Sequence, residues 1–137
     1  MTNNLKTKGQ LEAQISEAII QFEKDYMGRG PTEAKTYLVE NLVIIKLQGV
    51  LTPSEKQLAN SAESDSGREL IKRMRHALLQ KGRHLLEVVI KDVLGVSIKS
   101  LHSDLSTITG ERMIIFSLED VPEVIALHEA KLKEIVG

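Results

Sequence analysis

The amino-acid sequence predicts an α+β fold, in which two β-hairpins form one four-stranded antiparallel sheet and amphipathic helices pack on it. The first observation is that apolar residues recur at helical spacing in three long segments. The second is that two pairs of short β-rich runs alternate with these segments. The resulting order, α-β-β-α followed by α-β-β-α, is a loose internal duplication. No linker interrupts it, so we expect a single domain over residues 1–137, with residues 1–8 as a loose tail.

The first half of the chain is typical of a helix followed by a hairpin. Apolar side chains share one face of a helix that begins near Gln10 and ends at Gly28. Strands over residues 35–39 and 42–47 follow, and the second of them is too apolar for an edge strand with a fully wet face. The apolar face of the helix consists of Leu11, Ile15, Ala18, Ile19, Phe22 and Tyr26.

The second half begins with a short helix, because Thr52 and Glu55 form a capping box around Pro53. A second capping box, Ser66-Gly67-Arg68-Glu69, predicts the start of the longest helix, over about residues 67–94. Its predicted apolar face consists of Leu70, Ile71, Met74, Ala77, Leu78, Leu85, Val88 and Val89.

A second hairpin is expected over residues 95–118, with its turn at Thr109-Gly110-Glu111, where glycine supplies a positive φ. The last helix opens near Pro122. Its apolar stripe consists of Val121, Val124, Ile125, His128, Leu132 and Ile135.

Composition excludes several classes of protein. The net charge is −1 and aromatic residues make up 3% of the chain, which argues against a nucleic-acid partner. The absence of cysteine removes disulfides and thiol chemistry and is compatible with a reducing cytoplasm. No apolar run is long enough to span a bilayer. We therefore expect a cytoplasmic protein, which a partner would have to bring to a membrane.

Two groups of polar residues are candidate sites. His102 and Asp104 alternate on one strand and so point to one face. This suits two metal ligands, a histidine oriented for proton transfer, or a polar strand beside a turn, and we favour the last interpretation. A basic face on the longest helix could contact an anionic partner, although a solvated face is the commoner explanation. It consists of Arg68, Lys72, Arg75 and Arg83. No metal or cofactor motif is present, so neither a metal nor a cofactor is expected.

Three stretches carry a family resemblance: T-K-G-Q-L-E-A-Q-I-S-E-A-I-I-Q-F-E-K-D-Y-M-G-R-G-P, L-x-G-V-L-T-P-S-E-K-Q-L and S-L-H-S-D-L-S-T-I-T-G-E-R. Together they resemble a family of small bacterial proteins described as the C component of a sodium-translocating, membrane-potential-generating system. The resemblance implies a soluble accessory protein of a membrane system for ion or inorganic-carbon uptake. Several of the family's recognisable positions follow from caps and turns alone. The remaining ones, our candidate binding residues, are Arg29, His102, Asp104 and Arg112.

The favoured function is thus a non-catalytic accessory or regulatory protein with a membrane-protein partner. One alternative is an enzyme or binder of a small anion that uses His102 and Arg112, and another is a nucleic-acid or anionic-surface binder that uses the basic helix. The strands at residues 42–47 and 113–118 are partly apolar on both faces. Because one helical layer covers only one face of a sheet, we also expect a homo-oligomer, most simply a two-fold dimer.

Overall fold

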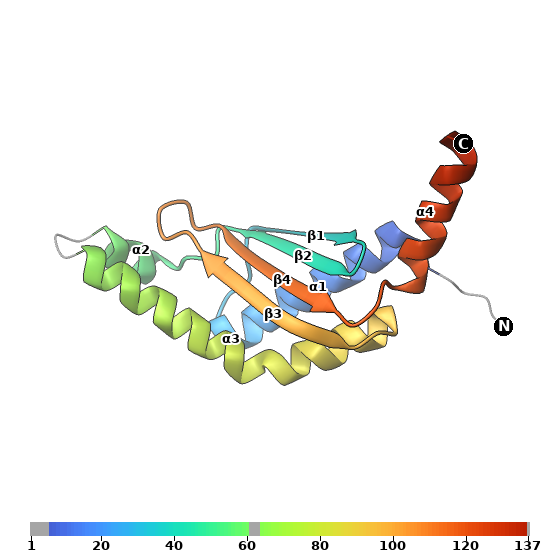
Figure 1. Ribbon diagram of the computed structural model, residues 1–137. Coiled ribbons are helices and arrows are strands. Elements are labelled where there is room, and N and C mark those ends of the chain that lie inside the picture. The colour runs from blue at the N-terminus through green and yellow to red at the C-terminus, as the bar shows by residue number, and fades with distance from the viewer. Residues whose placement is uncertain (1–5, 61–63, 137) are drawn as a thin grey trace.

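The computed structural model describes residues 6–60 and 64–136 and confirms the α+β fold. Four antiparallel strands form one sheet in the order β1-β2-β4-β3, so the central strands of the two hairpins pair with each other. Figure 1 shows α1 and α3 on one side of this sheet and α4 projecting at one end. The elements in chain order are α1 (Lys8–Met27), β1 (Glu33–Val39), β2 (Leu42–Gln48), α2 (Pro53–Ala59), α3 (Ser64–Leu94), β3 (Ile98–Leu105), β4 (Arg112–Leu118) and α4 (Glu123–Val136).

Helix α1 begins earlier than the sequence pattern indicates. The side chain of Thr7 accepts a hydrogen bond from the backbone N–H of Gln10, and the Gln10 side chain accepts one from the backbone N–H of Thr7. This reciprocal capping box starts the helix at Lys8, so Lys8 belongs to α1 and not to a tail. Residues 1–5 of the expected tail lie outside the described residues.

The start predicted for the longest helix is wrong. Helix α3 already begins at Ser64, so the Ser66-Gly67-Arg68-Glu69 segment lies inside it and caps nothing. Gly67 has a packing role there instead. A Cβ atom at this position would lie 2.3 Å from the carbonyl oxygen of Leu58 in α2, so only glycine allows the two helices to approach this closely.

The core lies between the sheet and helices α1 and α3. Buried side chains of the central strands alternate with partly exposed ones, which face the other side of the sheet. On that second side no helix from the described part of the chain covers the strands, and Tyr37 and Val39 are exposed there. We call this surface the open sheet face.

The face that α3 buries differs from the predicted one. The predicted face mixed buried residues such as Ile71 with exposed ones, because the helix is rotated about its axis from the orientation that hydrophobicity alone favours. The rotation places Gly82 beneath the ring of Phe22, where a Cβ atom would lie 2.6 Å from two ring carbons. The residues that α3 in fact buries along its length are Gly67, Ile71, Arg75, Leu79, Gly82, Leu86, Ile90 and Leu94.

Candidate functional site

Four buried charged residues meet beneath the sheet, one from each of four elements. We call them the ionic cluster: Glu23 of α1, Glu55 of α2, Arg75 of α3 and Arg112 of β4. Each is at most 7% exposed, and the formal charges of the two arginines and two glutamates cancel. A buried charge without a partner is costly. Because each charge of the cluster depends on partners from other elements, the cluster links the four elements to one another.

Glu55 and Arg75 form the strong pair of the cluster. The Arg75 Nε and Nη2 atoms donate to the two Glu55 carboxylate oxygens over 2.9 and 2.6 Å, and Nη2 also donates to the Val50 carbonyl over 2.7 Å. The Glu55 carboxylate further accepts from the Thr52 backbone N–H over 2.8 Å, which completes the capping box of α2. Burial alone would raise the pKa of Glu55, but the hydrogen bonds from Arg75 and Thr52 outweigh it and hold that pKa below its ordinary value.

Glu23 is the weakly bound member of the cluster. Its carboxylate oxygens lie 3.6 Å from Arg75 Nη1 and 3.8 Å from Arg112 Nη1, too far for hydrogen bonds, and no other described residue donates to them. Among the described residues, the Nε and Nη1 atoms of Arg112 and the Nη1 atom of Arg75 also lack a hydrogen-bond acceptor. Burial raises the pKa of Glu23, and the guanidinium groups of Arg112 and Arg75 offset this only in part.

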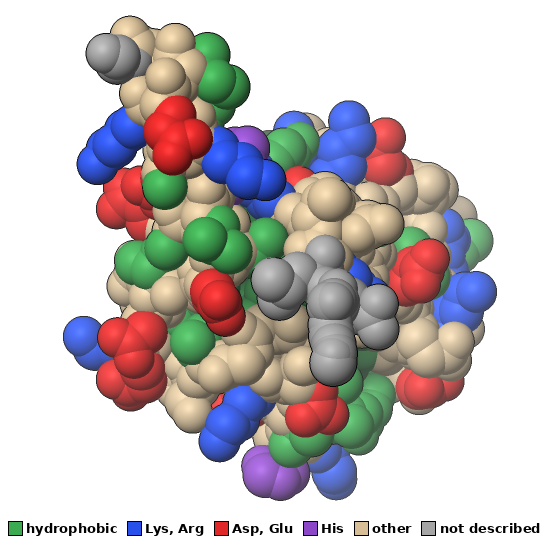
Figure 2. Space-filling view, turned by 90° about the vertical axis from the view of Figure 1, so that its right-hand side faces the viewer, with side chains coloured by type: hydrophobic (Ala, Val, Ile, Leu, Met, Phe, Trp, Pro, Cys, Tyr) green, Lys and Arg blue, Asp and Glu red, His purple; other side chains and the backbone are tan. Residues whose placement is uncertain are grey.

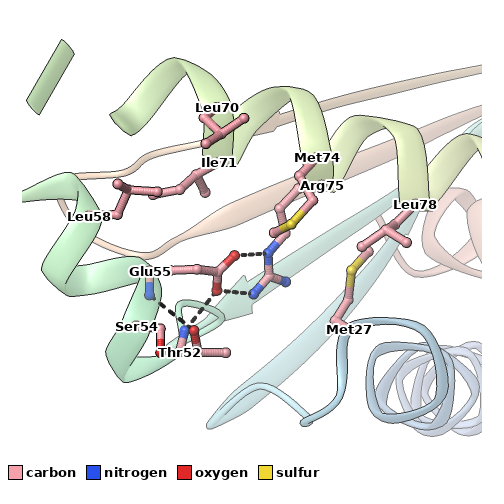
Figure 3. A pocket seen from close by; sticks show the side chains of 10 residues that line it. All are labelled: Met27, Thr52, Ser54, Glu55, Leu58, Leu70, Ile71, Met74, Arg75 and Leu78. Atoms are coloured by element: carbon pink, nitrogen blue, oxygen red, sulfur yellow. Dashed lines mark hydrogen bonds and ion pairs between the residues drawn. The ribbon is translucent and has the colours of Figure 1, made fainter. Parts of the chain in front are cut away.

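An apolar pocket of about 320 Å³ lies beside the cluster, between α2, α3 and the end of α1 (Figure 3). Its polar groups at Thr52, Glu55 and Arg75 are already bonded to one another, as the dashed lines in Figure 3 show. The pocket therefore offers mainly apolar contacts to an occupant. Its apolar lining consists of Met27, Leu58, Leu70, Ile71, Met74 and Leu78.

The apolar surface continues beyond the pocket along α3. We call the outward-facing series the α3 stripe: Leu70, Met74, Leu85 and Val88. Leu70 is 55% exposed, and the other three side chains are also exposed. Their spacing places them on one side of the helix, at an angle to the side that faces the core. An apolar stripe of this length beside a pocket is typical of a surface that binds another protein segment.

The structure does not bring His102 and Arg112 together. His102 lies on the open sheet face opposite Ile115, and its ring is 3.1 Å from the Ser100 hydroxyl. Arg112, on the neighbouring strand, points to the core side and is 2% exposed. The sheet therefore separates these two candidate residues.

The strand register places Asp104 opposite Met113, two residues from His102 along the same strand, whereas Arg29 follows the end of α1. Asp104 is 3.5 Å from Lys72 of α3, and together with Arg112 it lines a small cavity of about 150 Å³. Arg29 donates to the backbone carbonyls of Gly49 and Leu51 over 3.3 and 3.5 Å. It thus braces the segment that follows β2. Among the four candidates, the structure brings only Asp104 and Arg112 to one cavity.

The predicted basic face on the longest helix is wrong in one member. Arg75 is 2% exposed, because its guanidinium group belongs to the ionic cluster. Arg68, Lys72 and Arg83 lie nearer the surface, and each makes an ion pair, with Asp65, Asp104 and Glu87 respectively. The helix therefore presents less free positive charge than the sequence indicates.

The sequence analysis missed Glu23 and Glu55 as site residues, although the pattern held a signal for the cluster. Glu23 follows Ile19 by four residues on the buried face of α1, and Arg75 follows Ile71 in the same way on α3. Arg112 alternates with the buried residues of β4. Three charges in phase with apolar core positions indicate charges that pair inside the protein.

The described residues contain no feature of two other kinds of site. Across residues 6–60 and 64–136, no group of three or more His, Asp or Glu side chains could hold a metal ion. No helix within the same ranges has the length and apolar character needed to cross a membrane.

Comparison with known proteins identifies the family. The model of a family described as "Na+-translocating membrane potential-generating system (MpsC)" matches residues 7–120. The chain is 42% identical over 113 residues to the uncharacterized protein YbcI of Bacillus subtilis strain 168, a match that covers 82% of this chain and 89% of YbcI. It is also 33% identical over 67 residues to the uncharacterized protein YrhF of the same strain, covering 49% of this chain and 52% of YrhF. No solved structure matches the chain. The resemblance seen in the sequence is thereby confirmed, and the protein belongs to the MpsC family.

Proposed function

We propose that this protein is a non-catalytic accessory component of a Na+-translocating membrane system, and that it docks through the apolar pocket and the α3 stripe onto a membrane-protein partner. The family description supplies the membrane system. The observation that carries the proposal is the character of the pocket, which is apolar and contains no titratable side chain left free to react.

The state of Glu55 supports binding over catalysis. A general acid or base needs a pKa near the working pH and a lone pair or proton that can reach a substrate. The lowered pKa of Glu55 keeps it ionised, and Arg75 and Thr52 occupy its oxygens. The carboxylate therefore serves to hold α2 against α3, and this packing shapes the pocket.

The partner's docking segment is an amphipathic helix with one apolar face and acidic flanks. Apolar side chains at helical spacing suit the pocket and the α3 stripe, as in other complexes where a helix lies in a groove. Exposed Lys56 and Arg73 lie beside this surface, and exposed Lys81 lies within the α3 stripe between Met74 and Leu85. These cations would attract acidic residues on the partner. On this proposal the protein is cytoplasmic and peripheral to the membrane, and the partner holds it there.

Binding to membrane vesicles from the source bacterium tests the docking surface. We expect Met74→Asp to weaken cosedimentation of the protein at least tenfold, which corresponds to about 1.4 kcal/mol. Gln80→Asp is the matched control, because Gln80 is exposed on the same helix but lies off the stripe. Trypsin treatment of the vesicles should abolish binding, and liposomes of the extracted lipids should not bind. Equal binding of Met74→Asp and the unmodified protein would rule out this surface.

The small cavity at Asp104 favours a second candidate function, the binding of a small oxyanion. Four basic side chains line it, against one acidic side chain, Asp104. Phosphate at millimolar concentration should then raise the melting temperature more than chloride at equal ionic strength, and Lys72→Gln should remove the difference. Equal effects of the two salts would exclude this candidate. The four basic residues are Lys72, Arg75, His76 and Arg112.

We further propose that the protein is a homodimer. The open sheet face supports this proposal, because a single chain leaves its apolar side chains in contact with water.

A further inference from the structure

Helix α4 is an arm with few contacts to the rest of its own chain. Ile125, in its first turn, is the only residue of α4 that is buried. Ile135 and Val136 near its end are 80% and 85% exposed, and Leu132 is exposed as well. Figures 1 and 2 show α4 projecting beyond the body of the molecule, with hydrophobic side chains at its surface in Figure 2. This arm has one apolar side without a partner in the chain.

Most of the exposed apolar residues of α4 lie on a single face, and Leu127, which is 46% exposed, lies outside it. Leu132 and Ile135 continue the face that Val124 and Ile125 begin, with Leu132 seven residues after Ile125 and Ile135 three residues further on. Ala130 lies on the opposite face. An amphipathic helix in water gains stability mainly by burying its apolar face, so the last two turns of α4 require a covering surface.

The open sheet face has the matching shape and chemistry. One row of side chains crosses all four strands in register, with Tyr37, Ile44, Ile115 and His102 on β1, β2, β4 and β3. Three spacings of about 4.8 Å between strands give a width of about 14 Å. The ten residues 127–136 of α4 span about 15 Å at 1.5 Å per residue. The exposed part of the arm is therefore as long as the sheet is wide.

The charges on the two surfaces are complementary in one orientation. On one side of the apolar row the open sheet face carries Lys35 and Lys46, of which Lys46 is paired with Glu111 over 3.6 Å, and Asp104 lies in the same row on β3. Acidic Glu40 and Glu119 lie at the end of the sheet on the other side. The apolar face of α4 is flanked by Glu129 on one side and Lys131 on the other. With Glu129 toward the two lysines, Lys131 faces the acidic end.

The chain cannot make this contact with its own sheet. Four residues separate the end of β4 from the start of α4, and the backbone N–H of Glu119 donates to the Ser97 carbonyl over 2.9 Å. The burial of Pro122 and Ile125 then fixes the first turn of α4 at the end of the sheet, and from there the helix points away from it. A second copy must therefore supply the sheet that the arm covers.

We propose that the α4 arm of each copy lies across the open sheet face of the other copy, related by a two-fold axis. Each copy has one arm and one open face, so the exchange closes at a dimer and leaves neither surface uncovered. This inference rests on the proposed homodimer and is independent of docking through the α3 stripe, which lies elsewhere on the molecule.

Light scattering on full-length protein at about 50 µM tests the dimer. We expect twice the chain mass of 15.2 kDa, and a single-chain mass for Leu132→Asp, because a carboxylate would then lie against the apolar row. Ala130→Asp is the matched control and should remain dimeric. Circular dichroism checks that each variant is folded. A monomeric unmodified protein, or a dimeric Leu132→Asp variant, would overturn the proposal.

Cysteine cross-linking tests the exchange itself, since the protein has no cysteine of its own. A chain with Ile135→Cys is mixed with a chain with Ile44→Cys, and the mixture is oxidised. A covalent link between the two different chains is expected, with no link when Ala130→Cys replaces Ile135→Cys. Equal cross-linking in both mixtures would contradict the arrangement. Vesicle binding separates this proposal from the docking proposal, because Met74→Asp should remain dimeric while Leu132→Asp should still bind membranes.

Discussion

At the scale of single residues, the two buried glutamates have opposite effects on stability. Arg75 and Thr52 hold Glu55 ionised. Its contribution to the free energy of unfolding is therefore present above the ordinary pKa of 4.5 and is lost as the pH falls through the lowered pKa of Glu55. Glu23 has a raised pKa, so its contribution is complete below 4.5 and lost as the pH rises through the raised value. Glu55 thus stabilises the protein at neutral pH, whereas ionisation of Glu23 weakens it.

This difference predicts different results for two conservative substitutions. Glu55→Gln should lower the free energy of unfolding at pH 7 by about 3–5 kcal/mol, because it removes the hydrogen-bonded counter-charge of the buried Arg75 guanidinium and leaves only the more distant Glu23 carboxylate, 3.6 Å away. Glu23→Gln should cost less, and it should remove the decline in stability that the unmodified protein shows as the pH rises above 4.5. Urea unfolding of both variants between pH 4 and 8 measures the two effects. Equal losses at pH 7 would show that the Glu23 charge supports both arginines.

At the scale of elements, α3 shows how packing overrides helix propensity. Alanine is a better helix former than glycine by about 1 kcal/mol, so propensity alone predicts that replacing Gly82 would stabilise α3. A Cβ atom there would collide with the Phe22 ring, which is itself stacked on Tyr26 with ring centroids 4.5 Å apart. Gly82→Ala should therefore destabilise the protein by about 1–3 kcal/mol.

The control for this prediction is Gly9→Ala in α1. A Cβ atom at Gly9 would have no neighbour within 4 Å, so alanine there gains the helix propensity without a clash. Thermal unfolding of the two variants should shift in opposite directions. Stabilisation by Gly82→Ala would mean that α1 and α3 can separate at little cost, which the close packing argues against.

The same helix explains why its buried face could not be predicted. Apolar residues occupy two sides of α3, and a pattern of hydrophobicity cannot tell which side faces the core. One of these sides, with Leu70 and Met74, is the α3 stripe. The core side contains Arg75 and Gly82, which lower its apparent hydrophobicity but pack there because Glu55 and Phe22 lie opposite them.

At the scale of the whole molecule, the helices cover the sheet unevenly. Helices α1 and α3 bury one sheet face, while the open sheet face, the α3 stripe and the α4 arm leave apolar side chains exposed on three separate surfaces. Monomeric proteins rarely keep such surfaces free of a partner. Assigning the stripe to a membrane-protein partner and the arm to a second copy gives each of the three surfaces an occupant.

The sequence by itself determined the features that depend on local interactions. These are the order of the elements, the two hairpins and the capping box at Thr52, because hydrophobic period, caps and turns act between residues close in the chain. The family also follows from the sequence, through the three stretches that carry the resemblance. Only the tertiary structure decided which face of α3 is buried and that His102 and Arg112 lie on opposite sides of the sheet. The irregular pairing between Ile98 and Ser100 belongs to the same class, since a shift of one residue exchanges the two faces of a strand. The ionic cluster likewise requires α1, α2, α3 and β4 to meet, and contacts between residues so far apart in the chain follow from packing of the whole domain.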